Sequence, residues 1–422
     1  MSNKPLPSLI KIEYSSEHIL VKFRPYIPSE FIKATINAFQ ISEYKVIPRI
    51  NVYKIRIPEN STVDEMLTIM KQHQYVEHAE PDYVAYKTET PNDFYFKYQY
   101  ALYNEGQYIG PVGSPQGQPS ADIKATPAWD ETKGSEDIII AIIDTGIDLT
   151  HPDLENKIES SGYDFVHSDF EAEDDEGHGT FVAGIAAAET NNSEGIAGVA
   201  WNCKLLPVKV LDELGEGYYS WIIDGIIWAV DHEAAVVNLS LGGPIDSPFL
   251  RNAVQYAHQN DVVVAAAAGN DGGSVVYPAA YDDYCLAVAA TDYNDHRPVW
   301  SNCGSQVDVA APGKLIYSTY PTSLTPPGYF PYMWGTGTSA STPHVSGLAA
   351  LIKSIKPWLT ADEVMYVIKY SADDVNESSH PGKDIFIGYG RINMEKALVP
   401  LVVEQQQMEE MSSQTSLKKS LR

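Results

Sequence analysis

The sequence predicts an α/β protein in which a doubly wound, mostly parallel sheet flanked by helices follows a small α+β domain. Within residues 121–398, apolar runs such as DIIIAIID, AAVVNLSL and DVVVAAAAGN are typical of strands buried on both faces of a parallel sheet. Helical patterns such as FVAGIAAAE and WIIDGIIWAVDHE separate these runs. This alternation indicates a doubly wound sheet, whose active site lies at the carboxyl ends of its strands.

The rest of the chain has other residue patterns. Within residues 18–88, HILVKF and NVYKIRI alternate apolar and polar residues as half-buried strands do, and STVDEMLTIMKQH has helical spacing. These patterns predict the small α+β domain. Residues 89–120 are rich in Gly, Pro, Gln and Tyr and predict a linker. Residues 1–17 form an N-terminal tail, and the polar residues 399–422 predict a disordered C-terminal tail.

The charge of the chain is concentrated in its C-terminal part. The 422 residues carry a formal net charge of −27. Residues 1–88 hold 11 Lys and Arg against 10 Asp and Glu, whereas residues 89–422 hold 18 against 46. The strong negative charge of residues 89–422 disfavours nucleic acid and anionic membranes as partners, and it favours cationic partners and bound calcium. We therefore expect a monomer that binds neither nucleic acid nor membrane.

The cysteines and the N-terminus bear on the cellular compartment. Cys203, Cys285 and Cys303 cannot all pair, so we expect small buried thiols, and a single bridge between Cys285 and Cys303 stays open. The N-terminus lacks a basic segment followed by a long apolar core, and no apolar run reaches the roughly 18 residues of a membrane span. These features favour a cytoplasmic location, or secretion if a leader precedes Met1.

Three motifs together suggest acyl-transfer chemistry. Asp144 ends an apolar strand, His178 lies between two glycines before an apolar helix, and Ser339 follows Gly337-Thr338 at the start of another helix. The order Asp, His, Ser is one of the known chain orders of the catalytic triad. A serine hydroxyl needs an imidazole to take its proton, and the imidazole needs a carboxylate to hold its tautomer.

A fourth motif supplies an oxyanion donor. The run VVVAAAAGN ends at Asn270, whose side-chain amide can donate to a developing oxyanion. The backbone N–H of Ser339, at its helix N-terminus, would be the second donor. Losing one such donor typically costs roughly 3–4 kcal/mol of transition-state stabilisation.

Other readings of these residues stay open. Taken alone, Asp144 could merely cap a turn and His178 could be an inert surface histidine. A catalytically silent binding protein is the alternative function, and the complete set of four residues argues against it. A lipase or esterase would show Gly-x-Ser-x-Gly and the order Ser, Asp, His, and the sequence shows neither.

The sequence resembles the subtilisin-like serine proteases (subtilases, peptidase family S8) in the stretches DTGIDLTHPDL, GHGTFVAGIAA, NLSLGG, AAAAGN and GTSASTPHVSGLAAL. Within that family, these stretches are most similar to those of the thermitase-like branch. The similarity covers roughly residues 90–396 and implies the subtilisin-like fold. It also implies a serine endopeptidase that cleaves protein or peptide substrates through an acyl-enzyme intermediate. In that family, the positions of Asp144, His178 and Ser339 form the triad, and that of Asn270 is the oxyanion donor.

The resemblance also assigns substrate-binding residues. Two segments would pair with the substrate as extra antiparallel strands, namely Leu214-Gly215 and Ser240-Leu241-Gly242. Val276 stands where the family often has glycine at the floor of the S1 pocket, which implies a shorter pocket that prefers Leu or Met at P1. The loop 212–216 holds three carboxylates, which suggest basic residues at P2 or P4; a solvated acidic loop is the other interpretation.

A structural calcium site is a further implication of the resemblance. Asp153 and Asp93 would supply carboxylates, Asn192 a side-chain oxygen, and Glu194 and Ile196 backbone carbonyls. Hard oxygen ligands of this kind suit Ca²⁺. A plain turn is the alternative for the NNSEG loop. The acidic run 171–176 could bind another ion or be solvated.

Residues 18–88 resemble the propeptides of this family, which aid folding and then inhibit. The resemblance implies a self-processing zymogen whose own N-terminal domain is an intramolecular inhibitor. The segment 78–86 could lie in the active-site cleft as a product-like strand, with cleavage between Tyr86 and Thr90, so that residues 89–120 begin the mature chain. A permanent accessory domain is the alternative. A degradative role and a precursor-processing role both stay open.

Overall fold

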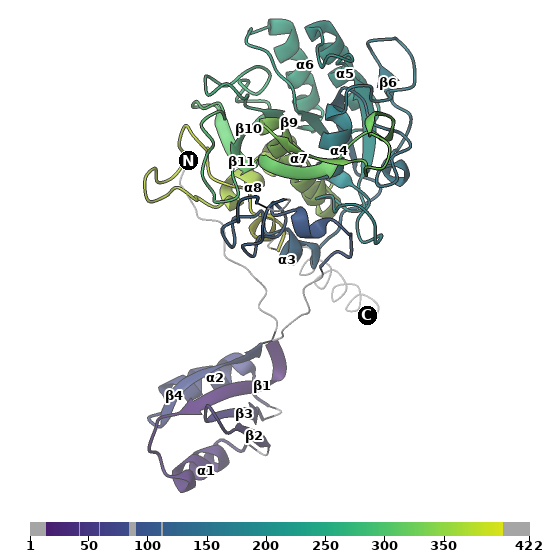
Figure 1. Cartoon of the computed structure of the whole chain (residues 1–422). Coiled ribbons are helices and arrows are strands. Elements are labelled where there is room, and N and C mark those ends of the chain that lie inside the picture. The colour runs from purple at the N-terminus through teal and green to yellow at the C-terminus, as the bar shows by residue number, and fades with distance from the viewer. Residues whose placement is uncertain (1–13, 42, 59, 84–89, 111–112, 400–422) are drawn as a thin grey trace, which may run out of the picture. The chain divides into compact units, whose positions relative to one another are not determined.

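The computed structural model describes residues 14–41, 43–58, 60–83, 90–110 and 113–399. The chain forms two compact units, residues 1–87 and residues 88–422 (Figure 1). The first strand begins at Tyr14, inside the predicted N-terminal tail. The predicted cleavage segment between Tyr86 and Thr90, and the predicted C-terminal tail apart from residue 399, lie outside the described residues.

The smaller unit is an antiparallel sheet of four strands in the order β2-β3-β1-β4, with two helices. Its elements are β1 (Tyr14–Phe23), α1 (Ser29–Ala38), β2 (Tyr44–Ile47), β3 (Val52–Arg56), α2 (Val63–Gln72) and β4 (Val76–Tyr83). Helix α2 begins after Thr62, whose hydroxyl accepts the Glu65 N–H while the Glu65 carboxylate accepts the Thr62 N–H. Side chains of both helices and of three strands share one apolar core.

The larger unit is built on a seven-stranded sheet in the order β11-β10-β9-β8-β5-β7-β6, in which every neighbouring pair is parallel. Its strands are β5 (Ile139–Asp144), β6 (Tyr163–Asp164), β7 (Lys204–Lys209), β8 (Val236–Leu239), β9 (Val263–Ala267), β10 (Leu286–Thr291) and β11 (Val307–Pro312). A separate antiparallel pair consists of β12 (Lys314–Thr319) and β13 (Tyr332–Thr336).

Helices cover both faces of this sheet. They are α3 (Ala125–Trp129), α4 (His178–Ala187), α5 (Tyr219–Asp231), α6 (Pro248–Gln259), α7 (Thr338–Ile355) and α8 (Ala361–Ser371). In β5, Ile140 and Ile142 join one apolar core with α4 and α7, whereas Ala141 and Ile143 join another with α5 and α6. Because successive strand residues point to opposite faces, the two cores lie on opposite sides of the sheet. The predicted α/β class and the preceding α+β domain are confirmed (Figure 1).

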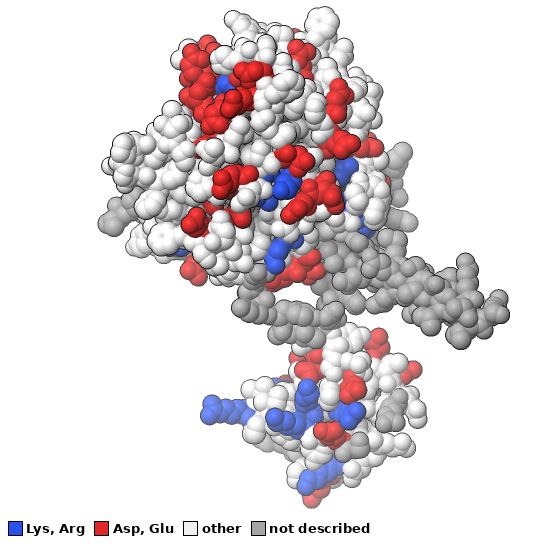
Figure 2. All heavy atoms as spheres, turned by 90° about the vertical axis from the view of Figure 1, so that its right-hand side faces the viewer, with Lys and Arg blue, Asp and Glu red and all other residues white. Residues whose placement is uncertain are grey.

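The surface charge follows the division into units. On the visible face of the larger unit, acidic side chains outnumber the basic ones among them, and on the smaller unit basic side chains are more prominent (Figure 2). Among the described residues, no helix is long and apolar enough to cross a membrane. Cys203, Cys285 and Cys303 are all free thiols, and the first two are buried. The open possibility of a bridge between Cys285 and Cys303 is therefore not realised.

Candidate active site

Asp144 and His178 meet at the carboxyl edge of the sheet. Asp144 is the last residue of β5 and is fully buried, and His178 is the first residue of α4, with about a third of its side chain exposed. The His178 Nδ1 lies 2.7 Å from the Asp144 Oδ1, which also accepts the Thr145 N–H at 2.8 Å. The carboxylate is therefore placed to keep a proton on Nδ1 and to leave Nε2 for proton transfer.

A buried carboxylate that sequence reasoning missed organises the loop before His178. Asp174 Oδ1 accepts the N–H groups of Glu176 and Gly177, and its Oδ2 accepts the N–H and the hydroxyl of Thr180. The hydroxyl of Thr145, the residue after Asp144, donates to the Asp174 Oδ1 at 2.8 Å. Asp174 thus ties the loop, the first turn of α4 and the end of β5 together, which fixes where His178 begins its helix.

The rest of the acidic run also has protein partners. Glu173 accepts the Leu149 N–H, and Glu176 accepts the His178 N–H. Asp175 pairs at 2.6 Å with the ammonium of Lys209, which is almost fully buried. A lysine inside the apolar run CKLLPVKVL was the signal for this buried cation, and sequence reasoning did not use it. These contacts favour a structural role for residues 173–176 over either earlier interpretation.

The local charges act strongly on His178. Burial alone lowers its pKa, but the charge of Asp144, the hydrogen bond to it and the charges of Glu176 and Asp174 together raise the pKa to about 9. The carboxylates around His178 therefore favour its protonated form. Since a general base must be unprotonated, proton abstraction by His178 becomes more effective as the pH rises.

Ser339 and Asn270 lie around a small open space. The Thr338 N–H and hydroxyl donate to the Asn270 Oδ1 at 2.7 and 2.9 Å. Because a backbone N–H can only donate, the other atom of this amide is the nitrogen Nδ2. A Cβ added to Gly337 would lie 2.9 Å from the Ser339 Oγ and 3.2 Å from Nδ2. The glycine therefore leaves room for a third group beside both atoms, as a substrate carbonyl would require.

A series of hydrogen bonds joins α7 to β8 beneath this space. The Ser346 hydroxyl donates to the Asn238 Oδ1, and the Asn238 Nδ2 donates to the Ser240 hydroxyl. The Ser240 hydroxyl in turn donates to the Ser339 carbonyl at 2.9 Å. The predicted substrate-binding residue Ser240 is thus bonded directly to the backbone of the predicted nucleophile.

A cavity of about 670 Å³ extends from His178. Its lining includes five of the predicted substrate-binding residues, namely Leu214, Gly215, Ser240, Leu241 and Gly242. The sixth, Val276, lies beside this cavity. A Cβ added to Gly242 would lie 2.5 Å from one methyl of Val276, and a Cβ added to Gly269 would lie 3.2 Å from the other. Val276 therefore lies between the segment after β8 that carries Ser240 and Gly242 and the segment after β9 that leads to Asn270.

Of the residues predicted to bind calcium, Asn192 and Ile196 both contact Asp153, and Asp93 contacts the neighbouring Asn191. Asp153 is fully buried and accepts the Ile196 N–H at 2.8 Å and the Asn192 Nδ2–H at 2.9 Å. Asp93, 5% exposed, accepts the Asn191 N–H at 2.8 Å. The Asn192 Oδ1 accepts the N–H of Glu194. The loop therefore wraps around two buried carboxylates that come from distant parts of the chain.

These two carboxylates are poorly neutralised. Burial raises the pKa of Asp93 and of Asp153 to about 6 despite their hydrogen bonds, and the nearby charge of Asp93 contributes to the rise at Asp153. The described residues contain no group of three or more His, Cys, Asp or Glu side chains placed to hold a metal ion. A calcium site here would consist of two carboxylates completed by amide and carbonyl oxygens.

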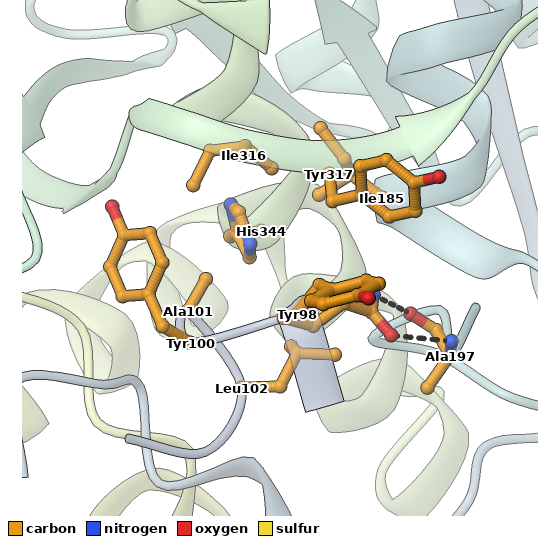
Figure 3. Close-up of a pocket in the computed structure, with 10 residues that line it drawn as sticks. Tyr98, Tyr100, Ala101, Leu102, Ile185, Ala197, Ile316, Tyr317 and His344 are labelled. Atoms are coloured by element: carbon orange, nitrogen blue, oxygen red, sulfur yellow. Dashed lines mark hydrogen bonds between the residues drawn. The ribbon is translucent and has the colours of Figure 1, made fainter. Parts of the chain in front are cut away.

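The histidine of the serine motif, His344, is remote from proton transfer. Its side chain is buried, its Nδ1 lies 2.9 Å from the Ala340 carbonyl, and burial lowers its pKa to about 4. Figure 3 shows its ring beside Ile316, facing a small cavity of about 10 Å³ that Tyr98, Tyr100 and Leu102 also line. The neutral imidazole is part of the packing beneath α7.

Comparisons with known proteins agree with this geometry. The sequence model of the subtilase family matches residues 135–390, and that of the fervidolysin N-terminal prodomain matches residues 2–82. The thermophilic serine proteinase of Bacillus sp. (strain AK1) is 41% identical over 355 residues, which cover 84% of this chain and 79% of that protein. Thermitase of Thermoactinomyces vulgaris is 43% identical over 310 residues, which cover 73% of this chain and 99% of that protein.

A solved structure supports the same assignment. A protease from Pseudoalteromonas arctica PAMC 21717 aligns with a TM-score of 0.64 at 33% identity, over 74% of this chain and 100% of that chain. The resemblance to subtilisin-like proteases, and to thermitase among them, is confirmed. The chain belongs to the subtilase family of serine peptidases and carries a fervidolysin-like N-terminal prodomain.

Proposed function

We propose that the protein is an endopeptidase in which Ser339 attacks the peptide carbonyl, His178 is the general base and Asp144 orients His178. Asn270 Nδ2 and the Ser339 N–H stabilise the oxyanion. The 2.7 Å contact between His178 and Asp144 is the observation that carries the proposal. It holds the imidazole in the tautomer that can take a proton from serine.

The chemistry has two stages. His178 Nε2 takes the Ser339 proton as the hydroxyl oxygen bonds to the carbonyl carbon, and it then gives that proton to the leaving amine, which leaves an acyl-enzyme ester. A water molecule, deprotonated by the same nitrogen, attacks the ester and releases the acid and the serine. The space beside Gly337 is where the carbonyl oxygen would face Asn270 in both stages.

We propose further that the prodomain inhibits the catalytic unit and is removed by self-cleavage between Tyr86 and Thr90. The match of residues 2–82 to a prodomain supports this, as does the separation of the chain into two compact units at residues 87 and 88. A prodomain that stays attached as an accessory domain is the alternative.

The masses of the wild type and of Ser339→Ala, each expressed as the full chain, test both proposals. We expect the wild type to yield a shortened chain beginning near Thr90, and Ser339→Ala to stay intact until wild-type enzyme is added. Equal processing of both proteins alone would point to a host protease. An intact wild type that still cleaves peptides would support the accessory domain, and a wild type without peptidase activity would contradict the proposed function.

Val276 supports a preference for medium-sized P1 side chains. Its methyl groups occupy the gap between Gly242 and Gly269, which a glycine would leave open. We expect Leu and Met at P1 to be cleaved faster than Phe and Tyr, and Val276→Gly to reverse the order. A wild-type profile dominated by aromatic P1 residues would contradict this.

We also propose a structural Ca²⁺ ion held by Asp93, Asp153 and Asn192 together with the backbone carbonyls of Glu194 and Ile196. The two buried carboxylates with raised pKa fit a divalent cation, because its charge would offset the cost of ionising them without water. Gly195 suits this loop, since a Cβ there would lie 1.7 Å from the Asp153 Oδ2. The ion would supply stability and take no part in the reaction.

A further inference from the structure

The geometry points to Asn302 as a positioning residue for the reaction, which holds the backbone of the loop 269–274 and thereby the oxyanion donor Asn270. This inference rests on the proposed endopeptidase function and adds a residue from outside the motifs that suggested it. Asn302 does not line the cavity beside His178, so its effect on the reaction would pass through Asn270.

The loop 269–274 follows β9 and carries Asn270 as its second residue. Thr338 fixes the side-chain oxygen of Asn270, but the amide nitrogen stays at one point only if the backbone beneath it is also fixed. Three of the six residues of the loop are glycines, so its own backbone is conformationally permissive. The position of the oxyanion donor therefore depends on contacts from outside the loop.

Asn302 supplies such contacts from a fully buried position. Its Oδ1 accepts the N–H groups of Asp271 and Gly273, each at 3.0 Å. Its Nδ2 donates to the Ser274 carbonyl at 2.8 Å, and its backbone N–H donates to the Gly269 carbonyl at 3.0 Å. These bonds reach from the first residue of the loop to the last, so they fix the backbone on both sides of the oxyanion donor.

The segment that carries Asn302 is itself fastened to the sheet. The Ala290 N–H, in β10, donates to the Ser301 hydroxyl at 3.0 Å. The fit between the segment and the loop is also close, because a Cβ added to Gly269 would lie 2.2 Å from the Asn302 Nδ2. Through Asn302, the position of a buried strand thus determines the position of the loop.

A double-mutant cycle between Asn302 and Asn270 tests the inference. Misplacing a group at the reacting centre by about 1 Å can cost about a hundredfold in rate. Because Thr338 still holds the Asn270 side chain in Asn302→Ala, we expect a smaller loss, with kcat for a peptide amide about tenfold lower and KM almost unchanged. In an Asn270→Ala background, Asn302→Ala should change kcat by less than about twofold, because the donor that it positions is already absent.

Asn104→Ala is the matched control, because Asn104 is another buried asparagine that closes a loop. Its Oδ1 accepts the Gly106 N–H, and its Nδ2 donates to the Ala121 carbonyl. This substitution should lower the melting temperature about as much as Asn302→Ala does and leave kcat at the wild-type value. If Asn302→Ala does not fold, Asn302→Asp takes its place in the cycle, since it keeps the volume and the acceptor oxygen. Its kcat should be about threefold lower, again only while Asn270 is present.

An unchanged kcat in the Asn302 variant, or an equal loss of kcat with and without the Asn270 amide, would overturn the inference while leaving the proposed function intact. A wild type that cleaves neither the peptide nor casein would instead count against the proposed function.

Discussion

Two acidic regions of the larger unit solve the same electrostatic problem differently. In the loop before His178, the carboxylates have donors within the protein, and Asp174 alone accepts five hydrogen bonds. In the loop around Asp153, burial raises the pKa of two carboxylates to about 6. In the second region burial disfavours the ionised carboxylates, and a bound cation would offset that cost. Stability should therefore depend on calcium in one region and not in the other.

Removing Asp174 should have the largest effect, because five donors around the start of α4 lose their acceptor. We expect Asp174→Ala to lower the free energy of unfolding by about 3–5 kcal/mol, with or without calcium. Urea unfolding in a Ser339→Ala background, which avoids self-digestion, measures this. Glu171→Ala, an exposed carboxylate of the same run, is the control. A loss below about 1 kcal/mol would show that the loop does not depend on this carboxylate.

Removing calcium should come next. With calcium at about 100 to 1,000 times its Kd, chelation should lower the free energy of unfolding by about 3–4 kcal/mol. Asp153→Asn should lose most of this response, whereas Asp175→Asn should keep it. Thermal unfolding with calcium and with EDTA tests this, and identical curves for the wild type would contradict the proposed site.

Without metal, the contribution of Asp93 and Asp153 to stability should fall as the pH rises, the reverse of what a carboxylate with a lowered pKa contributes. The folded-state pKa of Asp93 and Asp153 is about 6, above the value of about 4 for an unfolded aspartate. Their contribution is therefore fully present below pH 4 and is lost as the pH rises toward 6. Subtracting the stability profile of metal-free Asp153→Asn from that of the metal-free wild type isolates this slope. Saturating calcium should remove this slope between pH 4 and 6, because the bound ion would keep the carboxylates ionised, and a slope of opposite sign in the metal-free proteins would contradict the assignment.

Breaking the pair of Asp175 and Lys209 should have a smaller effect. The Lys209 ammonium keeps the carbonyls of Thr145 and Leu211 when Asp175 is replaced, and the Asp175 side chain is 41% exposed. We expect Asp175→Asn to cost about 1 kcal/mol, less as salt is added. A cost as large as that of Asp174→Ala would mean that the buried ammonium depends on this carboxylate.

The smallest effect should appear in the pH dependence of catalysis. Because Glu176 is one of the charges that raise the pKa of His178, Glu176→Gln should move the rising limb of the kcat/KM profile to lower pH, by less than about one unit. A peptide substrate without charged side chains keeps direct effects of Glu176 on binding out of this measurement. An unmoved limb would show that the charge of Glu176 is screened from His178.

The sequence was informative wherever a short segment determines the local structure. The apolar runs predicted the buried strands, and Asp144, His178 and Ser339 were identifiable because each stands at a strand end or helix start within a recognisable motif. The loop with Asn192 stands out in the same way, and the Asn192 Nδ2 donates to Asp153, whereas the calcium site predicted there stays a prediction.

Sequence reasoning failed where partners come from distant segments. Nothing in EAEDDEG distinguishes the fully buried Asp174 from the more exposed carboxylates beside it, because its donors include Thr145 and Thr180, which lie outside this stretch. The three carboxylates of residues 212–216 looked alike, but the fold uses Asp212 as a turn acceptor and leaves Glu213 outside the cavity. Only tertiary packing separates these roles.

The hydrogen-bonded series from Ser346 through Asn238 and Ser240 to the Ser339 carbonyl joins the cleft floor and the start of α7 into one hydrogen-bonded body. A substitution within this body would displace the reactive hydroxyl together with the surface that aligns the substrate. The loop 212–216 lies outside the series, so it can vary without that displacement. The fold thereby separates the choice of substrate from the ability to react, and new cleavage preferences can evolve at the rim without a loss of rate.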